Sequence, residues 1–334
     1  MDRTCRRMGS IALAVWSAVV GAAVIPVGDA AASDPASVMA VPDDPGPPQL
    51  DHLGAARFLQ DHPDAVPVGV NDFGCRPTAA HPRPVILAHG TDATAYADWS
   101  VIGPQLVDAG FCVFAPNYGG KPGSSTSFGT QDIYVSAGQI GDFVDRVLAA
   151  TGADRVELVG FSQGANVTRY YVNKLGGAPK VGQWIGVASP SYGGILYGLV
   201  PVAEEHPFIF DLAELASSPA AVQQAQGSPF MNDLNAGGDT VPGVRYTTIG
   251  SWVDGIIQPF ENQKLRGPGA TNLILQDSCR VNLTGHFHMV YDPYVQQLVL
   301  NTLDPANAVA PVCVPVALGT GIGETLRAGS GSAQ

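Results

Sequence analysis

Short apolar runs alternate along the chain with longer segments in which apolar residues recur at helical spacing. The runs have the length of buried strands and cover residues 84–88, 111–115, 156–159, 184–188, 244–249 and 272–276. Helical spacing covers residues 53–59, 99–107, 140–148, 166–175 and 295–303. Because strands that alternate with helices are joined by crossover connections, the pattern predicts an α/β fold with a mostly parallel sheet covered on both faces.

Two helix boundaries carry signals of their own. Gly152 suits the end of the helix over 140–148, because glycine tolerates the left-handed conformation found there. Asp292 and Pro293 are typical of the N-cap and first position of a helix. The last helix is therefore predicted to begin at Pro293.

Residues 191–240 interrupt the alternation, since this stretch is too long for a simple crossover. Its apolar residues cluster, as in Phe208, Ile209 and Phe210. We interpret it as a mainly helical cap inserted over the carboxyl edge of the sheet, where open α/β sheets bind ligands. Such a cap would line an acyl groove and favour activation at a lipid–water interface. The alternative is an ordinary pair of packed helices with no role beyond the core.

The first 32 residues have the character of a secretory signal peptide. Basic Arg3, Arg6 and Arg7 precede an uncharged apolar run over 11–24, and three alanines at 30–32 supply a cleavage site after Ala32. A membrane anchor is the alternative, although the run is short for a span. The sequence therefore predicts a secreted, extracellular protein.

The remaining chain divides by composition into three parts. Residues 33–48 are rich in Pro, Ala and Asp and are expected to be flexible. Residues 49–316 form the predicted domain with its cap, and the Gly/Ser-rich stretch 317–334 is expected to be a flexible tail. With 334 residues, 46% of them hydrophobic, the chain can bury one large core or two modest ones.

The formal net charge of −12 argues against nucleic acid as a partner, because no basic patch offsets it. The excess of acidic side chains instead favours solubility.

Four cysteines remain once Cys5 leaves with the signal peptide. An even number in an exported chain indicates two disulfides, for which three pairings exist. Proximity along the chain favours Cys75 with Cys112 and Cys279 with Cys313. Since no Cys-x-x-Cys pair occurs, a zinc site is not expected, and the sequence indicates no metal or other cofactor.

Residues 160–164, Gly-Phe-Ser-Gln-Gly, stand between a predicted strand and a predicted helix. A nucleophile elbow requires this context: the serine sits on a sharp turn, and the glycines two residues before and after it avoid a collision. Ser162 is therefore the candidate nucleophile, with Gly160 and Gly164 shaping the elbow. The alternative is a Ser/Gly loop without chemistry.

A base and an acid should follow Ser162 in the chain order Ser, Asp or Glu, His. Four histidines precede the serine, and His206 lies in the insertion. His286 and His288 follow the last strand, and only one can be the base if the chain is extended there, because alternate side chains then project to different sides. Glycine before His286 favours His286. A His-x-His metal pair would need a third ligand, which is not evident.

Asp254 is the favoured acid, since it follows the strand over 244–249 closely. Four other carboxylates suit the role less well: Asp239, Asp277, Asp292 and Glu261. Asp254 could instead be a simple turn residue before Gly255.

Two backbone N–H groups should bind the oxyanion. One belongs to Gln163, directly after the nucleophile, and the other is assigned to Thr91 in the His-Gly-Thr stretch after an early strand. Chain order makes His89 structural rather than catalytic.

These motifs together resemble the secreted bacterial lipases of lipase class 2, in the α/β-hydrolase superfamily. The resemblance rests on His-Gly-Thr at 89–91, the elbow, Trp-Val-Asp-Gly-Ile-Ile-Gln-Pro at 252–259, residues 272–279, and His286 followed by Asp292-Pro293. It spans about residues 71–313. Phe161 departs from it, because many relatives have histidine before the serine.

The resemblance implies an α/β-hydrolase fold and an extracellular ester hydrolase with Ser162, Asp254 and His286 as its triad. It also implies the disulfides Cys75–Cys112 and Cys279–Cys313. The sequence thus predicts a lipase or esterase whose partner is a lipid or ester substrate, with transient contact at a lipid–water interface. The competing interpretations are a polyester or cutin-like hydrolase and a catalytically silent envelope protein that binds lipids.

Overall fold

The structure, a computed structural model, describes residues 37–194 and 218–329. The predicted signal peptide lies outside the described residues. So does the centre of the predicted cap, with Phe208, Ile209 and Phe210.

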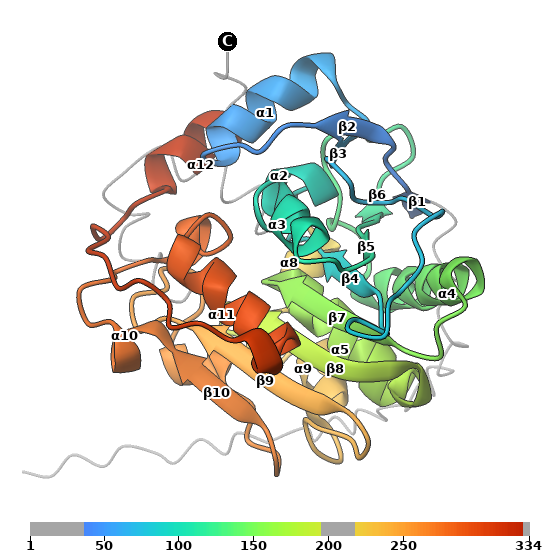
Figure 1. Ribbon diagram of the computed structural model, residues 1–334. Helices are drawn as coiled ribbons and strands as arrows, with labels where there is room; N and C mark the ends of the chain where they lie inside the picture. The colour runs from blue at the N-terminus through green and yellow to red at the C-terminus, as the bar shows by residue number, and fades with distance from the viewer. Residues whose placement is uncertain (1–36, 195–217, 330–334) are drawn as a thin grey trace, which may run out of the picture. The chain divides into compact units, whose positions relative to one another are not determined.

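A parallel sheet organises the described residues, and it has six strands in the order β10-β9-β8-β7-β4-β5 (Figure 1). Each strand arises from one of the predicted apolar runs: β4 (Val85–Ala88), β5 (Val113–Phe114), β7 (Val156–Phe161), β8 (Val181–Val187), β9 (Arg245–Gly250) and β10 (Thr271–Ile274). The prediction of an α/β fold with a parallel sheet is confirmed.

The apolar run over 272–276 is predicted as a single strand, but only its first part is a strand in the structure. Strand β10 ends at Ile274, and helix α10 (Leu275–Ser278) follows directly. Ile274 pairs with Gly250, the last residue of the neighbouring strand β9. The neighbouring strand ends at that pair, and the chain continues as a helix, whose backbone groups bond within the helix instead of to a second strand.

Helices cover both faces of the sheet. Successive side chains of β4 point to opposite faces, and all of them are buried. Val85 and Leu87 pack into one core cluster, and Ile86 and Ala88 pack into the other. The first cluster contains side chains of α2 (Ala95–Trp99), α3 (Ile102–Asp108) and α11 (Pro293–Leu303). The second contains side chains of α4 (Ile133–Thr151) and α5 (Gln163–Lys174). None of the helices in the described residues is long and apolar enough to cross a membrane.

Both helix boundaries marked in the sequence occur in the structure. Gly152 has φ 72 and donates its N–H to Leu148 O at the end of α4. Asp292 caps α11 by accepting from Tyr294 N. Both boundaries depend on a single residue, a glycine or a capping aspartate, and can therefore be recognised in the sequence.

The described part of the insertion is helical, in α8 (Pro219–Gln223) and α9 (Pro229–Asn235). Side chains of α9, namely Phe230, Met231 and Leu234, are buried in the core cluster of α4 and α5. This part of the insertion therefore belongs to the scaffold.

Residues 37–46, expected to be flexible, form strands in the structure. Strand β1 (Val38–Ala40) pairs with β6 (Asn117–Gly120), and β2 (Asp44–Gly46) pairs with β3 (Ala65–Pro67). Gly46 also lies close to the ring of Tyr96. Backbone pairing with distant segments orders this stretch, which its own composition does not predict.

Residues 317–329 of the expected tail are also ordered. Helix α12 (Ile322–Gly329) lies beside α1 (His52–Asp61), and the Oγ1 of Thr325 is 3.3 Å from the Nδ1 of His52 (Figure 1). A Cβ on Gly321 would meet the backbone oxygen of Phe287 at 2.9 Å. Close backbone contact explains why small residues precede the helix, although their composition alone is typical of a mobile tail.

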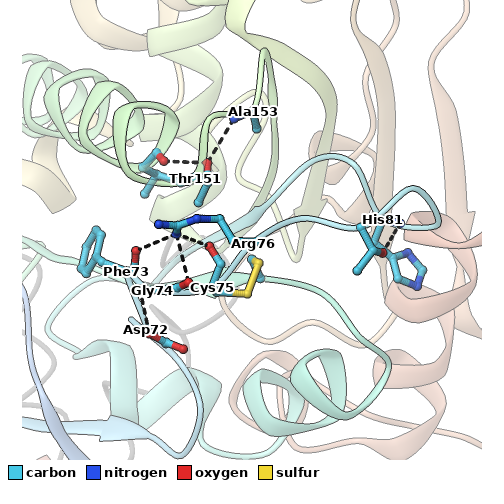
Figure 2. Close-up of a disulfide and its surroundings, with 11 residues drawn as sticks. Asp72, Phe73, Gly74, Cys75, Arg76, His81, Thr151 and Ala153 are labelled. Atoms are coloured by element: carbon cyan, nitrogen blue, oxygen red, sulfur yellow. Dashed lines mark hydrogen bonds between the residues drawn. A yellow bond between two sulfur atoms is a disulfide. The ribbon is translucent and has the colours of Figure 1, made fainter.

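The structure contains the two disulfides Cys75–Cys112 and Cys279–Cys313, with Cα–Cα distances of 5.7 and 5.5 Å. Figure 2 shows the first, with the guanidinium of Arg76 donating to the backbone oxygens of Phe73, Gly74 and Cys75. Cys112 directly precedes β5, and Cys279 directly follows α10. Each disulfide therefore ties a loop to the sheet or its neighbouring helix.

Removing either disulfide is expected to lower the melting temperature. The bridges close loops with sequence separations of 37 and 34, and each contributes about 3–4 kcal/mol in the loop-entropy model. Two double variants test this, one with both cysteines of the first bridge replaced by serine and one with both of the second. Each should melt roughly 5–10 °C below the unmodified protein in thermal unfolding. A pair of variants with an unchanged melting temperature would show that the bridges do not constrain the unfolded chain.

Candidate active site

The elbow predicted at Ser162 is a sharp turn between β7 and α5. Strand β7 ends at Phe161 and helix α5 begins at Gln163, so Ser162 alone forms the turn, with φ 51 and ψ −120. A non-glycine residue is held at such a positive φ only by strong surrounding constraints. Ser162 is buried, with 8% of the residue exposed.

The two glycines of the elbow lie against backbone atoms. A Cβ on Gly160 would be 2.4 Å from Ala165 N, and a Cβ on Gly164 would be 2.1 Å from Ala88 O. Backbone atoms cannot yield as a side chain can, so both positions require glycine. Gly164 also brings α5 against the end of β4.

A continuous hydrogen-bonded chain joins Ser162, His286 and Asp254. The Nε2 of His286 is 3.0 Å from Ser162 Oγ, and its Nδ1 is 2.9 Å from Asp254 Oδ2. Ser162 follows β7, Asp254 follows β9, and His286 lies in the 3-10 helix η4 (His286–His288) beyond β10. The parallel strands bring these three distant residues to the same edge of the sheet.

Asp254 is fully buried, and the backbone fixes its orientation. Its Oδ1 accepts from Ile256 N at 2.8 Å and Ile257 N at 2.9 Å, which leaves Oδ2 for His286. Asp254 therefore is also a turn residue, the alternative that its sequence context raised. The same carboxylate shapes the loop and orients the imidazole.

Two of the other candidate acids, Asp239 and Asp292, have contacts elsewhere. Asp239 accepts from Tyr192 OH and Arg266 N, and Asp292 accepts from Asn282 and Thr284 besides capping α11. The structure does not bring either of them to Ser162.

The structure places His286, and not His288, beside Ser162. Because η4 is helical, the expectation of opposite sides in an extended chain does not describe this segment. Burial lowers the pKa of His288, which favours its neutral form. Within residues 37–194 and 218–329, no group of three His, Cys, Asp or Glu side chains is placed to hold a metal ion.

The His-Gly-Thr loop, residues 89–91, follows β4 and lies beside the elbow. The Nε2 of Gln163 donates to Thr91 Oγ1 at 2.9 Å and to Gly129 O at 2.8 Å. Gln224, after α8, donates to the same hydroxyl at 3.4 Å. The side chain of Gln163 thus connects the two residues predicted to bind an oxyanion.

His89 is buried within this loop and contacts backbone on both ring nitrogens. Its Nδ1 is 2.8 Å from Gly90 O, and Tyr118 N donates to its Nε2 at 3.3 Å. These partners require the neutral tautomer with the proton on Nδ1. Burial lowers the pKa of His89 and so favours that neutral form.

Sequence reasoning missed the contributions of Gln224 and of the Gln163 side chain. Gln224 lies 133 residues from Thr91 in the chain, and nothing in its local pattern distinguishes it from neighbouring polar residues. The motif around Ser162 points to the backbone of Gln163 only.

A model of the lipase (class 2) family matches residues 82–299. Among solved structures, Aspergillus fumigatus lipase B is similar with a TM-score of 0.58 and 19% identity, over 80% of this chain and 65% of that one. The mature lipase BlEst2 of Bacillus licheniformis is similar with a TM-score of 0.51 and 16% identity, over 70% of this chain and 95% of that one. At these identities the structures show a shared fold, and this chain spans less than two thirds of the Aspergillus lipase.

Proposed function

The chain belongs to the lipase (class 2) family with its α/β-hydrolase fold, and on that premise we propose that it is a secreted serine hydrolase of acylglycerols or related fatty-acyl esters. The observation that carries the proposal is the hydrogen-bonded chain from Ser162 through His286 to Asp254. Two disulfides support export, because such bonds persist in oxidising compartments.

In the proposed reaction, Ser162 Oγ attacks the ester carbonyl while His286 Nε2 takes its proton. Asp254, held by two backbone N–H groups, stabilises the imidazolium and keeps its Nδ1–H directed inward. His286 then gives the proton to the alcohol oxygen as the ester C–O bond breaks, so the alcohol leaves and the acyl group remains bonded to Ser162 Oγ. Water activated by His286 clears the acyl group and restores the serine.

The oxyanion would be bound by the N–H groups of Thr91 and Gln163. Gln163 is the first residue of α5, so its N–H has no partner within the helix. The hydrogen bond from its side chain to Thr91 Oγ1 supports a fixed spacing between the two donors. Such preorganised donors stabilise charge that develops in the transition state.

Replacing Gln163 with leucine tests this spacing, since the backbone donor remains and only the side-chain bonds to Thr91 and Gly129 are lost. We expect kcat/KM to fall about 10-fold, less than the 10²–10³-fold typical of losing a whole oxyanion donor. Gln297→Leu is the matched control, because that side chain donates to Asn301 on α11, on a different helix from Gln163. Equal kinetics for both variants would remove the role assigned to the Gln163 side chain.

Covalent labelling tests the proposed function as a whole. A fluorophosphonate probe should modify Ser162, which peptide mapping can identify, whereas a silent lipid-binding scaffold would remain unlabelled. Rates on nitrophenyl esters of increasing chain length, on triglyceride emulsions and on polyester films would then define the substrate. Hydrolysis of polyester films in preference to acylglycerols would replace the lipase assignment with that of a polyester hydrolase.

A further inference from the structure

Asp98 is a buried carboxylate that the proposed reaction does not use. It lies in α2, is 2% exposed, and accepts from Gly90 N through Oδ2 at 2.7 Å. Its Oδ1 is 3.1 Å from the Nε2 of His52. Burying a carboxylate is costly unless both oxygens find partners, and here one partner is the backbone of the His-Gly-Thr loop.

The two peptide groups on either side of Gly90 are both held. Asp98 binds the N–H of Gly90, and the Nδ1 of His89 binds its oxygen at 2.8 Å. In a trans peptide the C=O and the following N–H point in opposite directions. The bond to Gly90 O therefore sets the direction of Thr91 N–H, and the bond to Gly90 N restrains a glycine whose backbone is otherwise free to rotate.

We propose that Asp98 is a positioning residue for the oxyanion donor. Its carboxylate anchors Gly90, and Thr91 N–H thereby stays aligned for the developing negative charge. The proposal rests on the proposed function, since an oxyanion forms only if Ser162 attacks an ester. It adds an acidic residue outside the Ser162, His286 and Asp254 chain to the machinery of the site.

His52 holds Asp98 from the opposite side and connects it to both ends of the described chain. It is the first residue of α1, its ring packs edge-on against Tyr291 at 4.9 Å, and its Nδ1 is 3.3 Å from Thr325 Oγ1 in α12. The N-terminal and C-terminal helices thus meet at the imidazole that contacts Asp98. This arrangement gives the ordered segment after residue 317 a role in supporting the loop.

The test compares Asp98→Ala with Asp98→Asn. Alanine removes the acceptor for Gly90 N–H, so we expect kcat to fall about 10–100-fold while KM changes less than threefold. The Ki of a boronic acid, whose tetrahedral adduct with Ser162 mimics the oxyanion, should rise by the same factor as kcat falls. Asparagine keeps an oxygen for Gly90 N–H and should recover most of both losses.

Glu157→Ala is the matched control, because Glu157 is also a buried carboxylate, 4% exposed and paired with Arg83. It lies on β7 beside Val85, the first residue of β4, at the end of the sheet away from Ser162. We expect the melting temperature of this variant to fall, whereas its kcat and boronate Ki should be unchanged. Asp98→Ala behaving in the same way would overturn the proposal, and so would an Asp98→Asn variant as impaired as Asp98→Ala.

Should Asp98→Ala fail to fold, His52→Phe decides the question together with Asp98→Asn. Loss of the imidazole removes the partner of Asp98 Oδ1, so the carboxylate can move away from Gly90 N–H. We therefore expect kcat to fall and the boronate Ki to rise in parallel, each about 3–10-fold. Unchanged values of both would overturn the proposal. All rates are expressed per site titrated with fluorophosphonate. Failure of the unmodified protein to label would reject the proposed function itself, which distinguishes the two outcomes.

Discussion

Ser162→Ala is expected to lower ester hydrolysis by about 10⁴–10⁶-fold while leaving the melting temperature within about 2 °C of the unmodified protein. The substitution removes one hydroxyl whose hydrogen bond is made to His286. Alanine and serine both carry a Cβ, so the steric cost of φ 51 at this position is the same for both and the elbow keeps its shape. Steady-state rates on a soluble nitrophenyl ester, together with thermal unfolding, measure both effects.

Variants of the two partners extend this test. Asp254→Asn retains an oxygen for the N–H groups of Ile256 and Ile257, but it can place an amide donor against His286 Nδ1, which favours the wrong tautomer. We expect about a 10⁴-fold loss for Asp254→Asn and for His286→Ala. His288→Ala is the control, and an inactive His288 variant beside an active His286 variant would reverse the assignment of the base.

Gly164→Ala is expected to prevent folding or to destabilise the protein by at least about 3 kcal/mol. The added Cβ would be 2.1 Å from Ala88 O, at the end of β4, and 2.6 Å from His89 O, in the His-Gly-Thr loop, and both are backbone atoms. Relief of the collision requires α5 to move away from β4. Soluble yield and urea unfolding measure the loss.

Gly138→Ala provides the matched control in α4, a helix whose buried side chains share a core cluster with those of α5. Gly138 lies inside α4, and a Cβ there would meet no atom of another described residue outside the helix backbone within 4 Å. Alanine loses less conformational entropy than glycine in a helix, so we expect a gain of about 0.5–1 kcal/mol. A Gly164→Ala variant as stable as Gly138→Ala would show that the elbow tolerates a side chain.

The local features of this fold could be predicted from the sequence because each depends on neighbouring residues. The glycines around Ser162, the cap at Asp292 and the helix end at Gly152 depend on neighbouring steric and hydrogen-bonding demands. Apolar runs also predicted the strands. A strand buried on both faces of a parallel sheet needs consecutive apolar residues, and such a run can be recognised in the sequence. The chain order of Ser162, Asp254 and His286 then placed the candidate triad at one edge of the sheet.

Long-range contacts decided the features that the sequence left open or predicted wrongly. Strand β10 ends at Ile274, which pairs with the last residue of β9, and the 3-10 helix η4 orients His286, a conformation that the residue pattern leaves open. Composition indicated flexibility for residues 37–46 and 317–329, yet partners far along the chain order both.

The surroundings of the His-Gly-Thr loop depended on tertiary structure most of all. Asp98 and His52 are 46 residues apart, and Thr325 lies 273 residues from His52. No local pattern signals such partners, because a buried carboxylate and an imidazole are matched only when the fold brings them within hydrogen-bonding distance. The sequence by itself determined the candidate nucleophile, Ser162, from the glycines and the strand and helix around it, whereas the packing of distant helices decided what holds the loop beside it.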